Sequence, residues 1–469
     1  MRPLLTHGSV GATLLRFALP VLGGYVLQSL GHSLHAAWIG SALGGAALAA
    51  ATQANNVLFA LIAVVFGISQ AAGILVAQAL GAGAPGQARR ATGTGASLFL
   101  GSAVLIAVAG WPLAPVLLDW IHTPPAVAPL AQSYLRWLLL ALPLQMLFIY
   151  VTAVLRGAGE AHRPFCFLLG GVALDAALAP ALILGWGPIP AMGMAGSALA
   201  LGLSQAASLA ALLAWMRCTH HPLWMSLRDR HLFVPDGRTA QALVRTGLPM
   251  GLQMVVVSGA LVALLAVVNP QGERIASAYS AAMQLWTYVQ MPALALGAAC
   301  TSMAAQCVGA GDWQRIGRIT RCGVLYSLAL TGGLVALVLL LDRQALSLFL
   351  PAESPALASA RQINQVVIGS FMLLGVSAVL AGVVRSTGAV WAPLWLLVLT
   401  LWGMRLPVAA GLQPWWGADA LWWSFPVSAL CSLAMSLAYY RWGRWRQPPQ
   451  LLDGLPLDHR ARQAPATAA

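Results

Sequence analysis

Charge is what this sequence has least of. Charged residues make up 8% of the 469 positions, and lysine does not occur at all. Soluble domains carry roughly a quarter charged residues, so the composition excludes a soluble multi-domain chain in spite of the length. With 59% hydrophobic residues and a mean hydropathy of +0.78, the chain is predicted to be an integral membrane protein.

Several signatures of catalytic and metal sites are also missing. The six cysteines show neither a CxxC pair nor zinc-ligand spacing, and no HExxH or GxSxG motif occurs. Cysteines in an apolar chain are most simply small packing residues. We therefore expect no disulfide, no metal site, no catalytic residues and no cofactor, and the chain is not predicted to be an enzyme.

The net charge of +13 does not indicate a nucleic-acid partner. All 25 basic residues are arginines, and most of them fall in short connectors and in the C-terminal tail. The positive-inside rule places arginines in the cytoplasmic connectors of membrane proteins. The expected partner is thus the lipid bilayer.

Apolar runs predict an all-α chain with twelve transmembrane helices. A crossing needs roughly 20 helical residues, and twelve runs reach that length, near residues 14–39, 46–76, 93–118, 130–154, 165–185, 193–216, 244–268, 277–304, 320–341, 362–384, 391–412 and 420–440. With the N-terminus inside, twenty arginines fall on the cytoplasmic side and four on the other, and Arg405 alone lies within a span. This separation predicts that both termini are cytoplasmic.

The two halves of the chain repeat each other. QALGAGAPGQARR at 78–90 is answered by QCVGAGDWQRIGR at 306–318, and RGAGEAHRP at 156–164 by RSTGAVWAP at 385–393. Offsets of 228 and 229 predict two homologous six-helix bundles related by a pseudo-two-fold axis along the membrane normal. The predicted parts are an N-terminal lobe at 1–216, a cytoplasmic linker at 217–243, a C-terminal lobe at 244–441 and a disordered cytoplasmic tail at 442–469.

One acidic residue lies deep inside a predicted span. Asp175 occurs in FLLGGVALDAALAPALILG, while the other eleven acids fall in loops, in tails or near span ends. A charge at the centre of a membrane helix costs about 2.5–3.5 kcal/mol on insertion scales, so such residues usually face a cavity or a partner. A repeat of this kind favours a transporter, with Asp175 at its functional site.

The paired motifs resemble the multidrug and toxic compound extrusion (MATE) family from about residue 14 to 441. The resemblance is carried by LPVLGGYVLQSL, QALGAG, QCVGAGD, RGAGEAHRP, LAPALILGWGPIPAMGMAGSALA and GMRLPVAAGL. It implies an antiporter that exports amphipathic, often cationic compounds against an inward H⁺ or Na⁺ gradient. Such a protein works by alternating access between its two lobes.

Two positions depart from the family pattern. The first-span aspartate of the family stands five residues before a closing glycine, here Gly40, so the resemblance puts His35 in its place. Counted from Pro164, the fifth-span asparagine and aspartate of the family fall at Asp175 and Ala179. A His35–Asp175 pair, if close, can hold or release a proton. The substitution therefore favours proton coupling over sodium coupling.

The other candidates line a substrate cavity or pack between helices. Ser197 is a candidate on family likeness alone, and Arg405 lies where the family often carries arginine. Intramembrane amides and methionines can serve either role; those singled out are Gln53, Asn56, Gln253, Gln284 and Met283.

The sequence thus predicts a monomeric, multi-pass exporter in a bacterial plasma (inner) membrane, driven by protons. Its substrate would be a small amphipathic molecule. Two alternatives stay open: a sodium-coupled drug exporter, and a flippase for lipid-linked oligosaccharides of the same superfamily. The flippase would need a basic cavity for pyrophosphate, and Arg405 is the one positive charge predicted inside a span.

Overall fold

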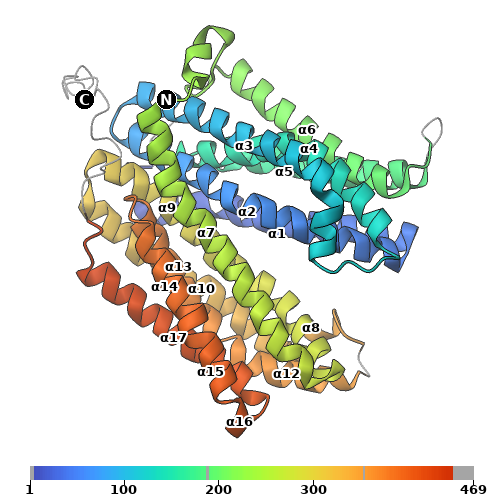
Figure 1. The fold of residues 1–469 in the computed structure, drawn as a ribbon. Helices are drawn as coiled ribbons and strands as arrows, with labels where there is room; N and C mark the ends of the chain where they lie inside the picture. The colour runs from blue at the N-terminus through green and yellow to red at the C-terminus, as the bar shows by residue number, and fades with distance from the viewer. Residues whose placement is uncertain (1–4, 186–189, 352–353, 447–469) are drawn as a thin grey trace. The chain divides into compact units, whose positions relative to one another are not determined.

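The computed structural model describes residues 5–185, 190–351 and 354–446, and these residues form helices joined by short turns, with no strand among them (Figure 1). Among the described residues, eleven helices are long and apolar enough to cross a membrane, and a pair of helices bent by 45° makes a twelfth when it is counted as one broken span. Each of the twelve predicted spans falls on one of these crossings. The predicted all-α membrane fold is therefore confirmed.

The six spans of the N-terminal half are single helices. Gly44 at φ +84° separates the first two, a backbone conformation that side chains with a Cβ rarely adopt. The helices are α1 (Val10–Leu43), α2 (Gly45–Gly81), α3 (Pro85–Trp120), α4 (Ala128–Gly157), α5 (His162–Leu184) and α6 (Gly193–Cys218).

Several spans of the C-terminal half are interrupted. The eighth breaks at Gln290, where Pro292 opens the next helix without a backbone N–H to donate. The eleventh contains a π-helical turn, η3 (Leu399–Arg405). The other elements are α7 (Gly237–Val268), η2 (Asn269–Gln271), α8 (Glu273–Val289), α9 (Met291–Ala310), α10 (Trp313–Leu340), α11 (Asp342–Ser347), α12 (Pro355–Val367), α13 (Ser370–Arg385), α14 (Trp391–Val398), α15 (Leu406–Gly411), α16 (Gln413–Trp416) and α17 (Asp419–Trp442).

The chain divides into two compact units, which we call the N lobe (residues 23–251) and the C lobe (described residues 5–22 and 252–446). Close backbone packing explains why α7 begins in the N lobe. A Cβ on Gly67 of α2 would lie 2.0 Å from the carbonyl oxygen of Gly247 on α7. Small residues permit such an approach between membrane helices. The units therefore part inside α1 and α7, whereas the repeat places the lobe boundaries on either side of residues 217–243.

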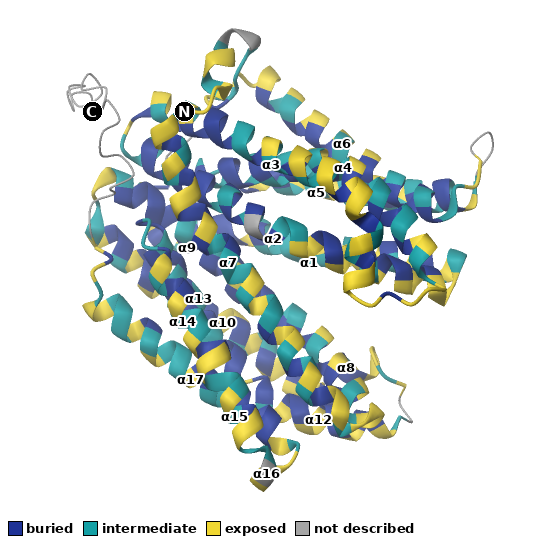
Figure 2. Cartoon of the chain, viewed as in Figure 1, coloured by how far each residue is buried: buried dark blue, intermediate teal, exposed yellow. Residues whose placement is uncertain are grey.

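Buried residues occur in the helices of both lobes (Figure 2), but the two cores differ in composition. In the N lobe, aliphatic side chains of α2, α3 and α4 surround Tyr134 and Tyr150. In the C lobe the core contains a cluster of aromatic rings among its aliphatic side chains: Trp286 packs on Phe425 with ring centroids 5.4 Å apart, and Tyr279 stacks on Trp422 at 5.8 Å. Aromatic rings bury large areas in fixed geometries, so this cluster distinguishes the C-lobe core from that of the N lobe.

The predicted linker is partly helical and is fixed to the N lobe. It contains the 3₁₀ helix η1 (Leu227–Phe233), which begins with a capping box between Ser226 and Asp229. Arg89 of α3 forms an ion pair with Asp229 at 2.8 Å. Hydrogen bonds from the Ser226 backbone and side chain, together with Arg89, lower the pKa of Asp229.

The predicted disordered tail begins inside the described chain. Trp445 keeps 2% of its exposure, stacks on Tyr440 and donates its indole N–H to the Tyr440 carbonyl at 2.7 Å. Trp445 thus packs back on the end of α17. Residues 447–469 lie outside the described residues.

Candidate functional site

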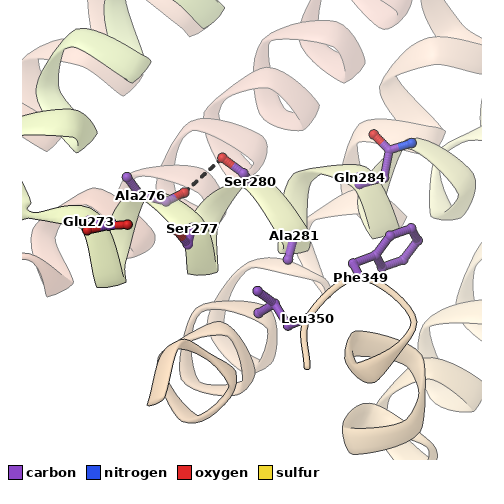
Figure 3. A pocket seen from close by; sticks show the side chains of 8 residues that line it. All are labelled: Glu273, Ala276, Ser277, Ser280, Ala281, Gln284, Phe349 and Leu350. Carbon is purple, nitrogen blue, oxygen red and sulfur yellow. Dashed lines mark hydrogen bonds between the residues drawn. The ribbon is translucent and has the colours of Figure 1, made fainter. Parts of the chain in front are cut away.

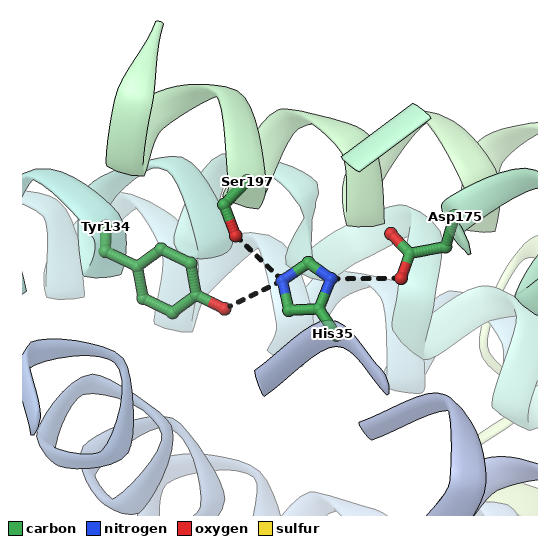
Figure 4. Close-up of polar contacts among 4 residues, drawn as sticks. All are labelled: His35, Tyr134, Asp175 and Ser197. Carbon is green, nitrogen blue, oxygen red and sulfur yellow. Dashed lines mark hydrogen bonds and ion pairs between the residues drawn. The ribbon is translucent and has the colours of Figure 1, made fainter. Parts of the chain in front are cut away.

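The structure brings His35 of α1 and Asp175 of α5 into contact inside the N lobe. His35 Nδ1 and Asp175 Oδ2 are 3.0 Å apart, and each residue keeps only 7% of its exposure (Figure 4). Both helices run unbroken past these positions, so their backbone polar groups are satisfied within the helices. The two side chains must therefore satisfy each other and a few neighbours.

Two hydroxyl groups complete the surroundings of the imidazole. Ser197 Oγ of α6 lies 2.9 Å from His35 Nε2, and Tyr134 Oη of α4 lies 3.4 Å from the same nitrogen. A hydroxyl can either donate or accept a hydrogen bond. Ser197 can therefore donate to a neutral His35 and accept from a protonated one, so both charge states of the imidazole are satisfied.

The carboxylate of Asp175 keeps one oxygen free. Oδ1 is buried and has no hydrogen-bond partner among the described residues. Asp175 and His35 line a cavity of about 130 Å³ together with His32, Asn55 and Gln145. A water molecule needs at least about 10–15 Å³ of such space, so the cavity has room for several waters or a small polar group. Oδ1 is thus the oxygen of the pair that has no hydrogen bond.

The two amides of α2 that were predicted to line a cavity, Gln53 and Asn56, each follow a cavity-lining residue by one position in the sequence. Thr52 and Asn55 line the cavity, whereas Gln53 and Asn56 are not among its lining residues. Residues three apart share one helix face and adjacent residues do not. The presence of amides in the sequence of α2 therefore does not show which face of the helix lines the cavity.

The predicted C-lobe residues do not gather at one site. Gln253 accepts a hydrogen bond from Arg385 Nη1 at 3.1 Å, and Met283 packs against the C-lobe core. Gln284 lines an open hollow of about 480 Å³ with Glu273 and Phe349 (Figure 3). These residues thus have three separate surroundings.

Arg405 has polar and aromatic neighbours within the C lobe. It ends η3, donates through Nε to Ser428 Oγ at 3.0 Å, and places its Cζ 4.3 Å from the centre of the Phe425 ring. Its Nη2 is buried and has no hydrogen-bond partner among the described residues. The guanidinium therefore lies inside the lobe rather than extending toward an end of the span.

Sequence reasoning missed several polar residues that line the cavity, among them His32, Tyr134 and Gln145. His32 could have been found, because QSLGHSLHAAWIG places it three residues before His35, on the same helix face. Tyr134 gives no such signal, because its span carries several large apolar residues of similar burial. Only the packing of α4 beside α1 and α6 selects it.

The comparisons with known proteins agree with this architecture. The sequence profile of the MatE family matches residues 20–181 and 249–410, one match in each half, with the offset of 229 found in the internal motifs. The chain belongs to the MATE family. The probable multidrug resistance protein YoeA of Bacillus subtilis is 31% identical over 94% of this chain and 96% of its own. YpnP, another probable multidrug resistance protein of that organism, is 29% identical over 94% and 97%.

Solved MATE structures share the fold of this family member. One is described as the outward-facing conformation of a multidrug resistance MATE family transporter of the MOP superfamily. It has a TM-score of 0.85 at 21% identity and covers 95% of this chain and 98% of its own. A point mutant of the Vibrio cholerae MATE transporter VcmN also has a TM-score of 0.85, at 19% identity, over 92% and 96%. The chain is therefore a multi-pass transporter of the MATE fold.

Proposed function

We propose that this MATE protein is an antiporter that exports amphipathic, cationic compounds in exchange for protons by alternating access. The observation that carries the proposal is the His35–Asp175 pair on the wall of the N-lobe cavity, in which Asp175 Oδ1 has no hydrogen-bond partner among the described residues. We further propose that the protein acts as a monomer in a bacterial inner membrane with both termini in the cytoplasm. Reporter fusions at the two termini test the orientation.

The charge of the pair supports exchange of one proton for one cation. With His35 protonated and Asp175 ionised, the pair is neutral, and both imidazole N–H groups have acceptors, Asp175 Oδ2 and Ser197 Oγ. Loss of one proton leaves a net charge of −1 in an apolar interior, where an unbalanced charge is unfavourable. A cation at Oδ1 removes that imbalance. Proton arrival then neutralises the pair and weakens the hold on the cation.

The donor set favours protons over sodium. A hard cation such as Na⁺ prefers several oxygen ligands, whereas the nearest groups here are an imidazole, two hydroxyls bonded to it and one free carboxylate oxygen. An imidazole that titrates near neutral pH is suited to carrying a proton. Among the described residues no arginine lines this cavity, whereas the flippase alternative would need basic groups for a pyrophosphate-linked cargo.

The test is dye export from proteoliposomes under a proton gradient or a sodium gradient imposed separately. We expect the proton gradient to drive export and the sodium gradient, with pH equal on both sides, to leave it at the background rate. Export sustained by sodium alone would overturn proton coupling and favour the sodium-driven alternative.

A further inference from the structure

Arg405 is a charged group inside the C lobe without a charged partner. Among the described residues, no carboxylate lies within ion-pair distance of it, and its Nη2 is buried without a hydrogen bond. Asp342, a buried acid of the same lobe, already has partners. It accepts hydrogen bonds from Arg361 Nε at 3.0 Å and from Asn364 Nδ2 at 2.9 Å. No described residue therefore balances the positive charge of Arg405.

The guanidinium is held in one orientation. Ser428 accepts from Nε, and the Phe425 ring covers one face of the plane at 4.3 Å. These contacts leave the edge formed by Nη1 and Nη2, which is the edge that binds a carboxylate through two parallel hydrogen bonds. Arg405 is half-buried, so the side chain is not sealed within the core.

The backbone at Arg405 has a feature common at binding sites. The π-helical turn Leu399–Arg405 interrupts α14 and α15, and π turns within helices occur frequently at functional sites. An arginine within a membrane span is itself a functional indication, since such residues usually face a partner or a water-filled space. The turn and the unpaired charge point to the same residue.

The depth of the guanidinium argues against a lipid headgroup as its ligand. Ser428, which binds Nε, lies nine residues into α17, or about 14 Å along the helix axis. Headgroups lie outside the hydrocarbon core of the bilayer. A ligand at this depth must be a compound that enters the transporter.

We propose that Arg405 binds the carboxylate of an amphipathic substrate through Nη1 and Nη2. The proposal rests on the proposed export function only in that the ligand is an exported compound. Aromatic acids suit the site, because the Phe425 ring already lies against one face of the guanidinium. The transporter would thus accept substrates that carry a carboxylate in addition to a cationic group.

Two dyes that differ in one group test this proposal. Rhodamine 110 carries a free carboxylate, and rhodamine 123 is its methyl ester. Binding to the purified protein is measured by fluorescence anisotropy without any ion gradient. We expect Arg405→Gln to weaken rhodamine 110 binding about tenfold, as for the loss of a charge-assisted hydrogen bond, and to change rhodamine 123 binding less than twofold. Arg405→Lys should retain part of the preference.

The matched control is Arg343→Gln, which removes an arginine from an exposed position of the same lobe and should change neither affinity. Equal weakening of both dyes by Arg405→Gln would show a structural role, and equal rhodamine 110 binding by wild type and Arg405→Gln would show no role; either result overturns the proposal. Because no gradient is used, failure of proton coupling in proteoliposomes leaves this test unaffected.

Discussion

Adjacent positions of the repeat carry opposite charges in the two lobes. Shifted by 229 residues, Asp175 of the fifth span corresponds to Met404 of the eleventh, directly beside Arg405. The acid lies on an unbroken helix and contacts an imidazole, whereas the arginine ends a π turn and contacts a hydroxyl and an aromatic ring. The repeated helices have thus been kept while their buried chemistry has diverged.

The neighbours of these residues have diverged in the same way. His35 corresponds to Leu264, a buried member of the C-lobe core, and Asn55 corresponds to Gln284 in the open hollow. A hydrogen-bonded acid–base pair therefore has an apolar counterpart. Duplication conserves the spacing of apolar residues that forms the spans, and it leaves individual polar positions free to change. The proposed proton exchange therefore belongs to the N lobe.

The largest expected effect is the loss of coupling in Asp175→Asn. The amide cannot carry the negative charge that alternately balances a proton and a cation, so proton-driven export should fall to the background rate. Glu273→Gln is the matched control, because it removes one carboxylate from the open hollow of the C lobe and should leave export within twofold. Export by Asp175→Asn at the wild-type rate would contradict the proposal that coupling depends on the N-lobe acid.

His35→Gln should separate binding from coupling. Glutamine can still donate a hydrogen bond to Asp175 but cannot take up a proton, so cation binding should persist within about threefold while its dependence on pH disappears. The measurement is dye affinity at a series of pH values. An unchanged pH dependence would show that another group carries the proton.

Asn364→Ala should affect stability and spare coupling. Asn364 accepts a hydrogen bond from Trp286 Nε1 at 3.0 Å and donates one to Asp342 at 2.9 Å. Without this side chain, the Trp286 N–H loses its acceptor and the Asp342 carboxylate loses one of its donors. We expect a destabilisation of about 2–3 kcal/mol, seen as a lower unfolding temperature of the purified protein. The folded variant should still export dye under a proton gradient, and a selective loss of coupling would contradict the assignment of coupling to the N lobe.

Ser197→Ala should give the smallest effect. It removes one hydrogen bond from His35 Nε2 while Tyr134 remains nearby at 3.4 Å. A loss of about 1 kcal/mol corresponds to a change of roughly fivefold in proton or substrate affinity. Dye export measured at several pH values tests this expectation. A complete loss of export would mean that Ser197 has a larger role than holding the imidazole.

The fold was largely predictable from the sequence because its main determinants are local. Apolar runs of sufficient length identify spans, and motifs repeated at one spacing identify the two halves. The breaks in the eighth, tenth and eleventh spans were not predicted. Pro292 gives a signal for the first of them, but the π turn that ends at Arg405 has no comparable sequence mark.

The candidate site was predictable only in part. Asp175 is identified by the cost of a buried charge and His35 by the family pattern, yet their contact depends on how α1 and α5 pack. The sequence could not choose Asn55 over Asn56, because both are amides and only the orientation of α2 separates them. Tyr134 was missed for the same reason, since its role depends on a neighbouring helix.

The central claim is that one site in the N lobe holds either a proton or a cationic substrate. Its most direct test is to add a permanently cationic dye to the purified protein in weakly buffered solution near neutral pH and to measure proton release. The account predicts about one proton released for each dye molecule bound by the wild type, and none by Asp175→Asn. Dye binding to the wild type without proton release would contradict it.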